Sequence, residues 1–339
     1  MPTANPPEER RRVEHRTVHG FPCVELRDKH LQLQILPDIG AKIISLKDLE
    51  SDRELLLPPQ RPSPPYARAF AGARYEAYDT SGFDECFPTI EACRCMPAAM
   101  PSSGWDLPDH GELWSRSWNW RSDGDDVLCT LSGAQWPYQF ERRIRLNGRS
   151  AVLSYRVVNL SPEPMPFLWA GHPLLIVHPG HRVVLPGDVR DVLINWSSND
   201  YLGRLGDRRS WPFLDPQQPT VDYSVVPDPR VRRAVKFFTD RLRNGSAALY
   251  DPGADRSIVF RFDAGKLPYL GVWLCYGGWP NAGATGHLTV ALEPGTGRPD
   301  SLAEAMRRGE HSVVAPDGEL TWELELSVAN GVPRFPDGQ

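Results

Sequence analysis

A hairpin signal near the middle of the chain constrains the fold class most strongly. In RRIRLNGRSAVLSYRVVN (142–159), Asn147-Gly148 lies between two alternating runs, and this dipeptide is typical of a tight two-residue β-turn. Similar alternation of apolar and polar residues recurs in HLQLQILP (30–37), SIVFRFD (257–263) and LTWELELSV (320–328). The last stretch places five side chains on one face: Leu320, Trp322, Leu324, Leu326 and Val328. These patterns predict half-buried antiparallel strands along the whole chain.

Helical signals are few by comparison. Ser301-Leu302-Ala303-Glu304 matches a capping box and Gly309 supplies a stop, which predicts one short helix. Because strands and helices do not alternate, a doubly wound parallel sheet is disfavoured. We therefore predict an all-β protein, a large antiparallel sandwich with long loops. With no linker or repeat in the sequence, we expect one domain at 21–330, a flexible lead-in at 1–20 and a tail at 331–339.

The composition excludes several function classes. Lys and Arg number 38 against 43 Asp and Glu, a net charge of −5, so no basic surplus favours nucleic acid. The sequence contains no apolar run near the ~20 residues that cross a bilayer, and the N-terminus lacks a signal-peptide pattern. We expect a cytoplasmic protein. The six cysteines are scattered, apart from the pair Cys93 and Cys95, which indicates reduced thiols rather than a zinc site.

A long segment with few strand signals runs from Pro58 to Asp109. It is rich in Pro, Gly and Asp and carries more aromatic residues than a disordered segment would. Long irregular connections in compact domains are usually functional or disordered. We predict that this one is ordered and lines a cleft.

Three further features carry candidate chemistry. PDHGELWSRSW (108–118) would line one face of a strand with His110, Glu112, Trp114 and alternate residues beyond, although a satisfied edge strand is the structural alternative. FLWAGHPLLIV (167–177) holds His172 inside an apolar run, where a buried structural histidine is the alternative. Glu293 ends the strand LTVALE (288–293), on the face opposite Leu288, Val290 and Leu292, and a Pro-Gly turn follows it.

A histidine and a glutamate make a general acid–base pair. Histidine has an unperturbed pKa near ~6.5, and a glutamate whose pKa is raised by burial can act opposite to it. No GxSxG elbow, GxGxxG turn or P-loop occurs, so a serine hydrolase, a dinucleotide enzyme and a P-loop enzyme are disfavoured. Two histidines and a carboxylate at these separations carry no metal-specific spacing, and we expect neither metal nor cofactor.

With these motifs identified, the chain resembles the aldose 1-epimerase (galactose mutarotase-like) family. The resemblance rests on six stretches that occur in the family's order: LQLQILPDIGAKIISLKDLESDRELL (31–56), GFDECFPTI (82–90), DHGELWSRSW (109–118), AGHPLL (170–175), YLGVWLCYGGWP (269–280) and ALEPGTGRPDSL (291–302). It implies a β-supersandwich with a sugar-binding cleft and a mutarotase activity that interconverts the α and β anomers of an aldose.

The resemblance also implies roles for individual residues. Glu293 matches the general base on the anomeric hydroxyl, His172 matches the acid that protonates the ring oxygen, and His110 matches a second histidine that binds sugar oxygens. Trp114, Trp273 and Trp279 are candidates for stacking on the sugar, and Asp240 is the nearest candidate for a sugar-binding aspartate. Further candidates for hydrogen bonds to hydroxyl groups or for lining the site are Arg74, Asp84, Glu112 and Lys236.

Several alternatives stay open at this stage. GFDECFPTI and HGELWSRSW also resemble the hexose-6-phosphate mutarotases, in which arginines bind the phosphate, as Arg74 and Arg116 could by bidentate contacts. The same fold could also serve a non-catalytic carbohydrate-binding protein, or a lyase or glycoside-active enzyme. In each case the expected partner is a small-molecule sugar, and the expected state is a monomer or homodimer.

Overall fold

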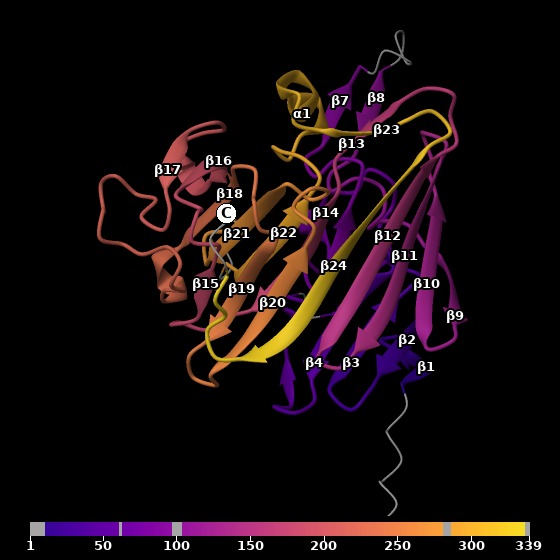
Figure 1. Cartoon of the computed structure of the whole chain (residues 1–339), viewed down its shortest axis with the longest axis horizontal. Coiled ribbons are helices and arrows are strands. Elements are labelled where there is room, and N and C mark those ends of the chain that lie inside the picture. Colours follow the sequence, from indigo (N-terminus) through magenta and orange to yellow (C-terminus); the bar gives the residue numbers. More distant parts are fainter. Residues whose placement is uncertain (1–10, 61–62, 97–103, 281–285, 336–339) are drawn as a thin grey trace, which may run out of the picture.

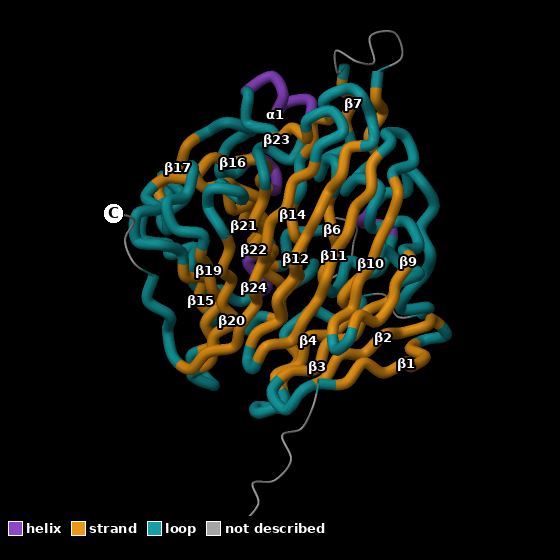
Figure 2. Tube along the Cα trace, turned by 45° about the vertical axis from the view of Figure 1, so that its right-hand side comes forward, coloured by secondary structure: helices purple, strands orange, loops and turns teal. Residues whose placement is uncertain are grey.

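Two large antiparallel sheets pack face to face in the computed structural model, which describes residues 11–60, 63–96, 104–280 and 286–335. In Figure 1 the smaller sheet lies in front, and Figure 2 shows the strands and loops in a view turned by 45°. The larger sheet has the order β1 (Arg12–Val18), β2 (Phe21–Arg27), β3 (Leu31–Leu36), β4 (Lys42–Asp48), β6 (Phe83–Cys86), β14 (Ala170–Ile176), β22 (Leu288–Gly295), β21 (Tyr269–Tyr276), β18 (Arg233–Thr239), β16 (Asp191–Ser197) and β17 (Arg208–Ser210), with β5 (Arg53–Glu54) beside β4.

The smaller sheet and the remaining elements complete the fold. The smaller sheet has the order β15 (Arg182–Val184), β19 (Ser246–Asp251), β20 (Arg256–Phe262), β24 (Glu319–Asn330), β12 (Ser150–Asn159), β11 (Tyr138–Asn147), β10 (Asp126–Ser132) and β9 (Asn119–Asp123). Two short ribbons pair β13 (Met165–Phe167) with β23 (Ser312–Val314) and β7 (Cys93–Cys95) with β8 (Trp105–Leu107). The helices are α1 (Leu302–Arg308) and the 3-10 turns η1 (Tyr75–Ala77), η2 (Ser198–Asp200) and η3 (Pro229–Val231). None of the helices in these described ranges is long and apolar enough to span a membrane.

The local sequence signals are confirmed where they depend on neighbouring residues. Asn147 pairs with Ser150 at the end of the β11–β12 hairpin, as the Asn-Gly dipeptide predicts. Ser301 caps α1 by accepting a hydrogen bond from the Glu304 amide, and Gly309 ends the helix with a left-handed φ of 66°. The prediction of an all-β antiparallel architecture is therefore confirmed.

Two predictions, one about the flexible lead-in and one about the buried face of the last strand, are wrong. Arg12–Val18, expected within a flexible lead-in, forms β1 and pairs with β2 along its whole length. Leu320, placed with the inward residues of β24, is 38% exposed, because β24 begins before it reaches the core. Residues 1–10 and 336–339 lie outside the described part of the chain.

The prediction that residues 110–118 form a strand is also wrong. His110 and Gly111 have φ angles of 58° and 73°, which bend the chain away from an extended path. A bridge between Phe87 and Gly111 replaces the expected ladder. The Cβ of any other residue at position 111 would lie 2.0 Å from the Phe87 carbonyl oxygen, so this close approach requires glycine.

The core fills the space between the two sheets and leaves the outer face of the larger sheet free for polar side chains. Val290 and Leu292 of β22 belong to the same buried cluster as Leu324 and Leu326 of β24. Because side chains alternate along a strand, Glu293 points to the opposite face. The segment from Pro58 to Asp109 contributes residues to the cavity on that outer face, as predicted.

Candidate active site

Two neighbouring rows of side chains cross the middle of the larger sheet. The pairing of β6, β14, β22 and β21 places Asp84 opposite His172 and Gly271 opposite Glu293. The pairs Ala170–Gly295 and Leu174–Ala291 fix the register so that His172 lies across from Glu293. Three segments far apart in the sequence thus supply the polar side chains of this row, and β21 adds a glycine.

The second row runs through β21, β18 and β16. Lys236 lies between Trp273 and Trp196, each its direct partner on an adjacent strand. The Lys236 amine leaves this row diagonally and forms an ion pair with Glu293. It can do so because Gly271 lies between them without a side chain: a Cβ there would lie 3.3 Å from Lys236 Nζ.

His172 and Glu293 face each other at the base of the cavity. His172 Nε2 lies 3.8 Å from Glu293 Oε1, and both side chains are more than 90% buried. Within the described part of the chain, Glu293 Oε1 and His172 Nδ1 are buried without a hydrogen-bond partner. Because buried polar atoms are nearly always satisfied, such atoms in a cavity indicate a place for a polar ligand or water.

Burial shifts the pKa values of this pair towards each other. It raises the pKa of Glu293, although Lys236 opposes the shift by stabilising the carboxylate. Burial also lowers the pKa of His172 well below its usual value, and the nearby charges of His110 and Lys236 add to that effect. The pKa of Lys236 is raised against the cost of its burial, first by Asp300 and then by Glu293. Lys236 is therefore the charged partner that stabilises the Glu293 carboxylate.

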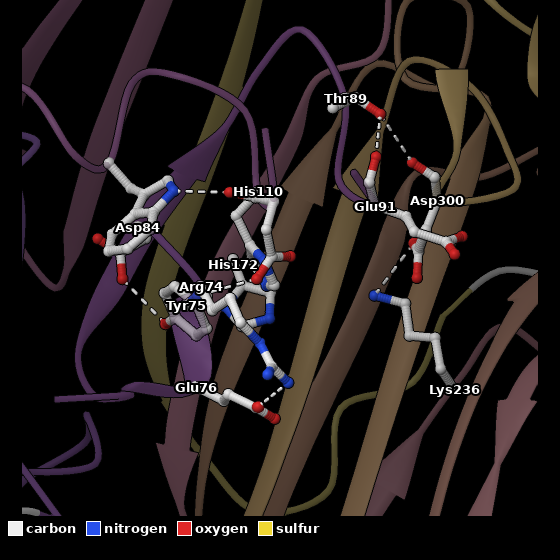
Figure 3. A network of polar contacts seen from close by, with 12 residues as sticks. Arg74, Tyr75, Glu76, Asp84, Thr89, Glu91, His110, His172, Lys236 and Asp300 are labelled. Carbon is white, nitrogen blue, oxygen red and sulfur yellow. Dashed lines mark hydrogen bonds and ion pairs between the residues drawn. The ribbon is translucent and has the colours of Figure 1, made fainter. Parts of the chain in front are cut away.

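His110 adds a second imidazole to the cavity lining, next to His172 and Tyr75. Its ring stacks on Tyr75 with a centroid distance of 4.0 Å, and its edge meets His172 at 5.2 Å (Figure 3). Asp109 accepts a hydrogen bond from the Tyr75 amide at 2.8 Å and contacts His110 Nδ1 at 2.8 Å. Asp109 thereby orients the imidazole so that its other nitrogen is free.

Beside His172, Asp84 belongs to a buried ionic cluster. Its Oδ2 accepts a hydrogen bond from the Tyr75 hydroxyl at 2.9 Å and lies 2.9 Å from Lys42 Nζ. Lys42 also pairs with Asp79. Asp84 therefore supports Tyr75 and His172 from behind and does not line the cavity.

The cavity over these rows has a volume of about 310 Å³, near the lower end of the range for small-ligand pockets. One wall is apolar and includes Trp273 and Trp279, whose rings meet nearly at a right angle, 87°. The lining also holds polar and charged side chains, with Lys236 between Trp196 and Trp273. The full lining comprises Tyr75, Ile90, Glu91, Asp109, His110, His172, Leu174, Asn195, Trp196, Lys236, Trp273, Trp279, His287, Thr289, Glu293 and Asp300.

The structure brings six of the eleven candidate residues to this lining and places the others elsewhere. The six are Glu293, His172, His110, Lys236, Trp273 and Trp279. Besides Asp84, Glu112 points inwards to the Tyr138 hydroxyl, and Trp114 packs behind Tyr75. Arg74 pairs with Glu76 at the surface with 77% of its side chain exposed. Asp240 is half exposed and pairs with Arg208 and Arg298.

Several lining residues were not among the candidates. Asp300 lies 3.7 Å from Lys236 Nζ (Figure 3). It also accepts a hydrogen bond from the Asn195 amide group at 2.8 Å. His287 lines the cavity beside Trp279 with its Nδ1 buried. Asp300 lies within a recognised motif, ALEPGTGRPDSL (291–302), and this is the one sequence signal that could have pointed to it. Over the described ranges, no group of three or more His, Cys, Asp and Glu could hold a metal ion.

The architecture is the galactose mutarotase-like β-supersandwich. No family model matches the chain, and no curated protein matches its sequence. Among solved structures, it is similar to a galactose mutarotase-like protein from Clostridium acetobutylicum, with a TM-score of 0.68 and 16% identity over 94% of this chain and 99% of the other. A proposed aldose 1-epimerase from Escherichia coli K12 gives a TM-score of 0.65 and 18% identity, with 94% and 99% covered.

A third similar structure is a galactose mutarotase related enzyme from Lactobacillus acidophilus, with a TM-score of 0.65 and 14% identity over 93% of this chain and 99% of the other. The coverage is nearly complete in all three cases, so the similarity extends over the whole sandwich. At these identities the similarity establishes the fold, and the chemistry has to be argued from the cavity itself.

Proposed function

We propose that this protein is a mutarotase that interconverts the α and β anomers of an uncharged aldose. The observation that carries the proposal is the buried pair of His172 and Glu293, with Nε2 and Oε1 3.8 Å apart. The atoms that face each other are an acid–base pair, and they lie in a cavity lined by both tryptophan rings and polar side chains. Such walls suit the apolar faces and the hydroxyl groups of a sugar ring.

In the proposed reaction, Glu293 Oε1 takes the proton of the anomeric hydroxyl group. The bond between C1 and the ring oxygen breaks, its electron pair stays on the ring oxygen, and His172 Nε2 supplies a proton there. Rotation about C1–C2 and the reverse steps close the ring on the other face of the aldehyde. The proton balance is neutral, because one proton enters Glu293 and one leaves His172.

Lys236 and His110 have supporting roles in this proposal. Lys236 holds Glu293 Oε2, which leaves Oε1 as the basic atom directed at the sugar. His110, oriented by Asp109, donates or accepts a hydrogen bond with a sugar hydroxyl. Trp273 and Trp279 form the apolar corner against which the ring packs.

The charge of the cavity favours a neutral sugar over a sugar phosphate. Its lining holds four carboxyl groups, Glu91, Asp109, Glu293 and Asp300, and Lys236 is its one Lys or Arg among the described residues. The two arginines considered for a phosphate are engaged elsewhere. Arg74 pairs with Glu76, and Arg116 binds Glu112 and the Ser132 carbonyl oxygen. A dianion would therefore meet net negative charge.

Anomer exchange over a panel of sugars tests the proposal. Two-dimensional NMR exchange spectroscopy on neutral aldoses and on their 6-phosphates measures the rate at which α and β signals interconvert. We expect at least one neutral aldose to exchange well above its rate in buffer, and the matching 6-phosphate to exchange more slowly than the free sugar. Exchange of no sugar above the buffer rate, together with saturable binding, would indicate the carbohydrate-binding protein instead.

A further inference from the structure

A pair of thiols lies at the edge of the molecule, on the three-residue strand β7. Cys93 and Cys95 are two residues apart, so their side chains share one face of the strand, and their Sγ atoms are 3.8 Å apart. All six cysteines lie in the described part of the chain and are free thiols. Five of them are buried, and Cys93 is the partly exposed one.

The surroundings of Cys93 favour its thiolate. The hydrogen bond from Cys95 lowers the pKa of Cys93 to about 5 against the effect of burial, and Thr89 Oγ1 adds a contact at 3.6 Å. The same interaction and burial raise the pKa of Cys95. One thiolate shared with one thiol is the arrangement found in reactive dithiols, where the thiolate is the nucleophile.

We propose that Cys93 and Cys95 form a peroxide-reactive dithiol site. The Cys93 thiolate attacks the O–O bond of a hydroperoxide and becomes a sulfenic acid, and the other oxygen leaves as water or an alcohol. Cys95 then attacks the sulfenic sulfur, the S–O bond breaks, and water leaves as the disulfide forms. The two thiols lose two electrons to the peroxide, and a small-molecule thiol can reverse the reaction by exchange.

The position of β7 allows this disulfide to close. Two residues of a strand span about 6.4–6.8 Å, which lies at the upper end of the Cα separations that disulfides bridge. β7 has three residues and is paired with β8 alone in the described sheets, so it can contract without disturbing a central strand. Figure 1 shows β7 and β8 at the top of the molecule beside α1, away from the two large sheets.

Thr89 joins the thiol pair to the rim of the cavity. Its hydroxyl group donates a hydrogen bond to the Glu91 carbonyl oxygen at 2.8 Å and lies 3.3 Å from that of Asp300 (Figure 3). Glu91 and Asp300 both line the cavity, and Asp300 contacts Lys236. The thiol pair is therefore one residue away from the cavity wall, although its chemistry does not depend on the proposed sugar function.

Peptide mapping tests the site directly. Arg94 lies between the two cysteines, so trypsin cuts the chain there and leaves the peptides 75–94 and 95–116, which a disulfide to Cys95 would hold together. Because the first peptide also contains Cys86, fragmentation of the linked pair identifies Cys93 as the partner. The full-length protein is treated with hydrogen peroxide, blocked with an alkylating reagent and digested. We expect the linked peptides, lost again after reduction. In the Cys95→Ser variant the reaction should stop at a Cys93 sulfenic acid, which a dimedone probe traps, and Cys129→Ser is the matched control that keeps the disulfide.

The pH dependence of alkylation provides a second readout that does not require the disulfide. For a thiol with a pKa of ~8.5, the fraction present as thiolate falls about 70-fold between pH 8 and pH 6. Over the same range the alkylation rate of Cys93 should change less than twofold. The proposal would be overturned by peptides that stay unlinked after peroxide treatment. It would also be overturned by an alkylation rate of Cys93 that falls between pH 8 and pH 6 as steeply as that of a reference thiol, glutathione.

Discussion

The amine of Lys236 and the carboxylate of Glu293 form an ion pair that crosses strand β21 above Gly271. The two residues belong to strands that are not neighbours, since β21 separates β18 from β22. A lysine next to a carboxylate stabilises the ionised form and so weakens the carboxylate as a base. The pair therefore sets the lowest pH at which Glu293 can accept a proton.

Replacement of Lys236 by methionine should move the acidic limb of the activity profile. Without the ammonium group, burial and the Asp300 carboxylate raise the pKa of Glu293 against less opposition, so this pKa rises further and kcat/KM falls off at a higher pH than in the wild type. The measurement is kcat/KM for anomer exchange against pH.

Gly271→Ala is the companion variant, because it leaves the charge in place and crowds Lys236 Cε and Nζ, which would lie 3.2 and 3.3 Å from the new Cβ. It should shift the limb in the same direction by a smaller amount. An acidic limb that stays in place in Lys236→Met would show that the ion pair does not tune Glu293.

The proposed anomer exchange by the wild-type protein should have a narrow, bell-shaped pH profile with its maximum on the acidic side of neutrality. The proposed reaction needs ionised Glu293 and protonated His172. Burial raises the pKa of the first and lowers that of the second, so the range in which both forms coexist is narrow. A plateau of kcat/KM extending above pH 8 would show that protonated His172 is not the acid.

His172 should also make the fold less stable as the pH falls. Its pKa is near ~6.5 in the unfolded chain and well below that in the folded protein, so below pH 6.5 the unfolded state binds the extra proton. The free energy of unfolding then drops by up to about 1.4 kcal/mol per pH unit until the folded pKa is reached. His172→Gln removes this dependence. The free energies of unfolding of the two proteins, measured in urea at pH 7, 6 and 5, should converge as the pH falls. A difference that stays constant over this range would contradict the lowered pKa of His172.

Oxidation of the thiol pair should lower the rate of anomer exchange. Contraction of β7 would act on Thr89, whose hydroxyl group holds the main chain at Glu91 and Asp300, and Asp300 contacts Lys236. Peroxide-treated protein is compared with the same sample after reduction, and Cys93→Ser, which cannot start the reaction, should be insensitive. Equal rates of anomer exchange before and after reduction would show that oxidation of the dithiol does not affect the cavity.

The sequence alone predicted the parts of the fold that depend on residues close together in the chain. The Asn147-Gly148 turn, the Ser301 cap and the alternation in β24 are all of this kind, and the structure confirms them. The strand predicted at 110–118 fails because alternating polar and aromatic residues also occur where each side chain has its own separate partner. Glu112 binds Tyr138, and Trp114 binds the Asp109 carbonyl oxygen.

Part of the candidate site could be predicted from the sequence for a related reason. Glu293 and His172 lie in short motifs with a recognisable pattern, and strand periodicity indicates the face that Glu293 occupies. The bridge from Lys236 to Glu293 depends on the register of three strands and on a glycine in the middle one, and no local pattern records such a combination. The same applies to Asn195, which reaches the cavity through its bond with Asp300.

The Glu293→Gln variant tests the central claim most directly. The amide keeps the shape of the side chain and removes its ability to accept a proton, and general catalysis is usually worth about 10²-fold or more. Anomer exchange of the preferred aldose is measured by NMR for wild type, for this variant and for Asp240→Asn, whose carboxylate lies outside the cavity. We expect a loss of at least ~10²-fold in kcat for Glu293→Gln and less than about twofold for Asp240→Asn. Exchange by Glu293→Gln at the wild-type rate would remove Glu293 as the base and contradict the account.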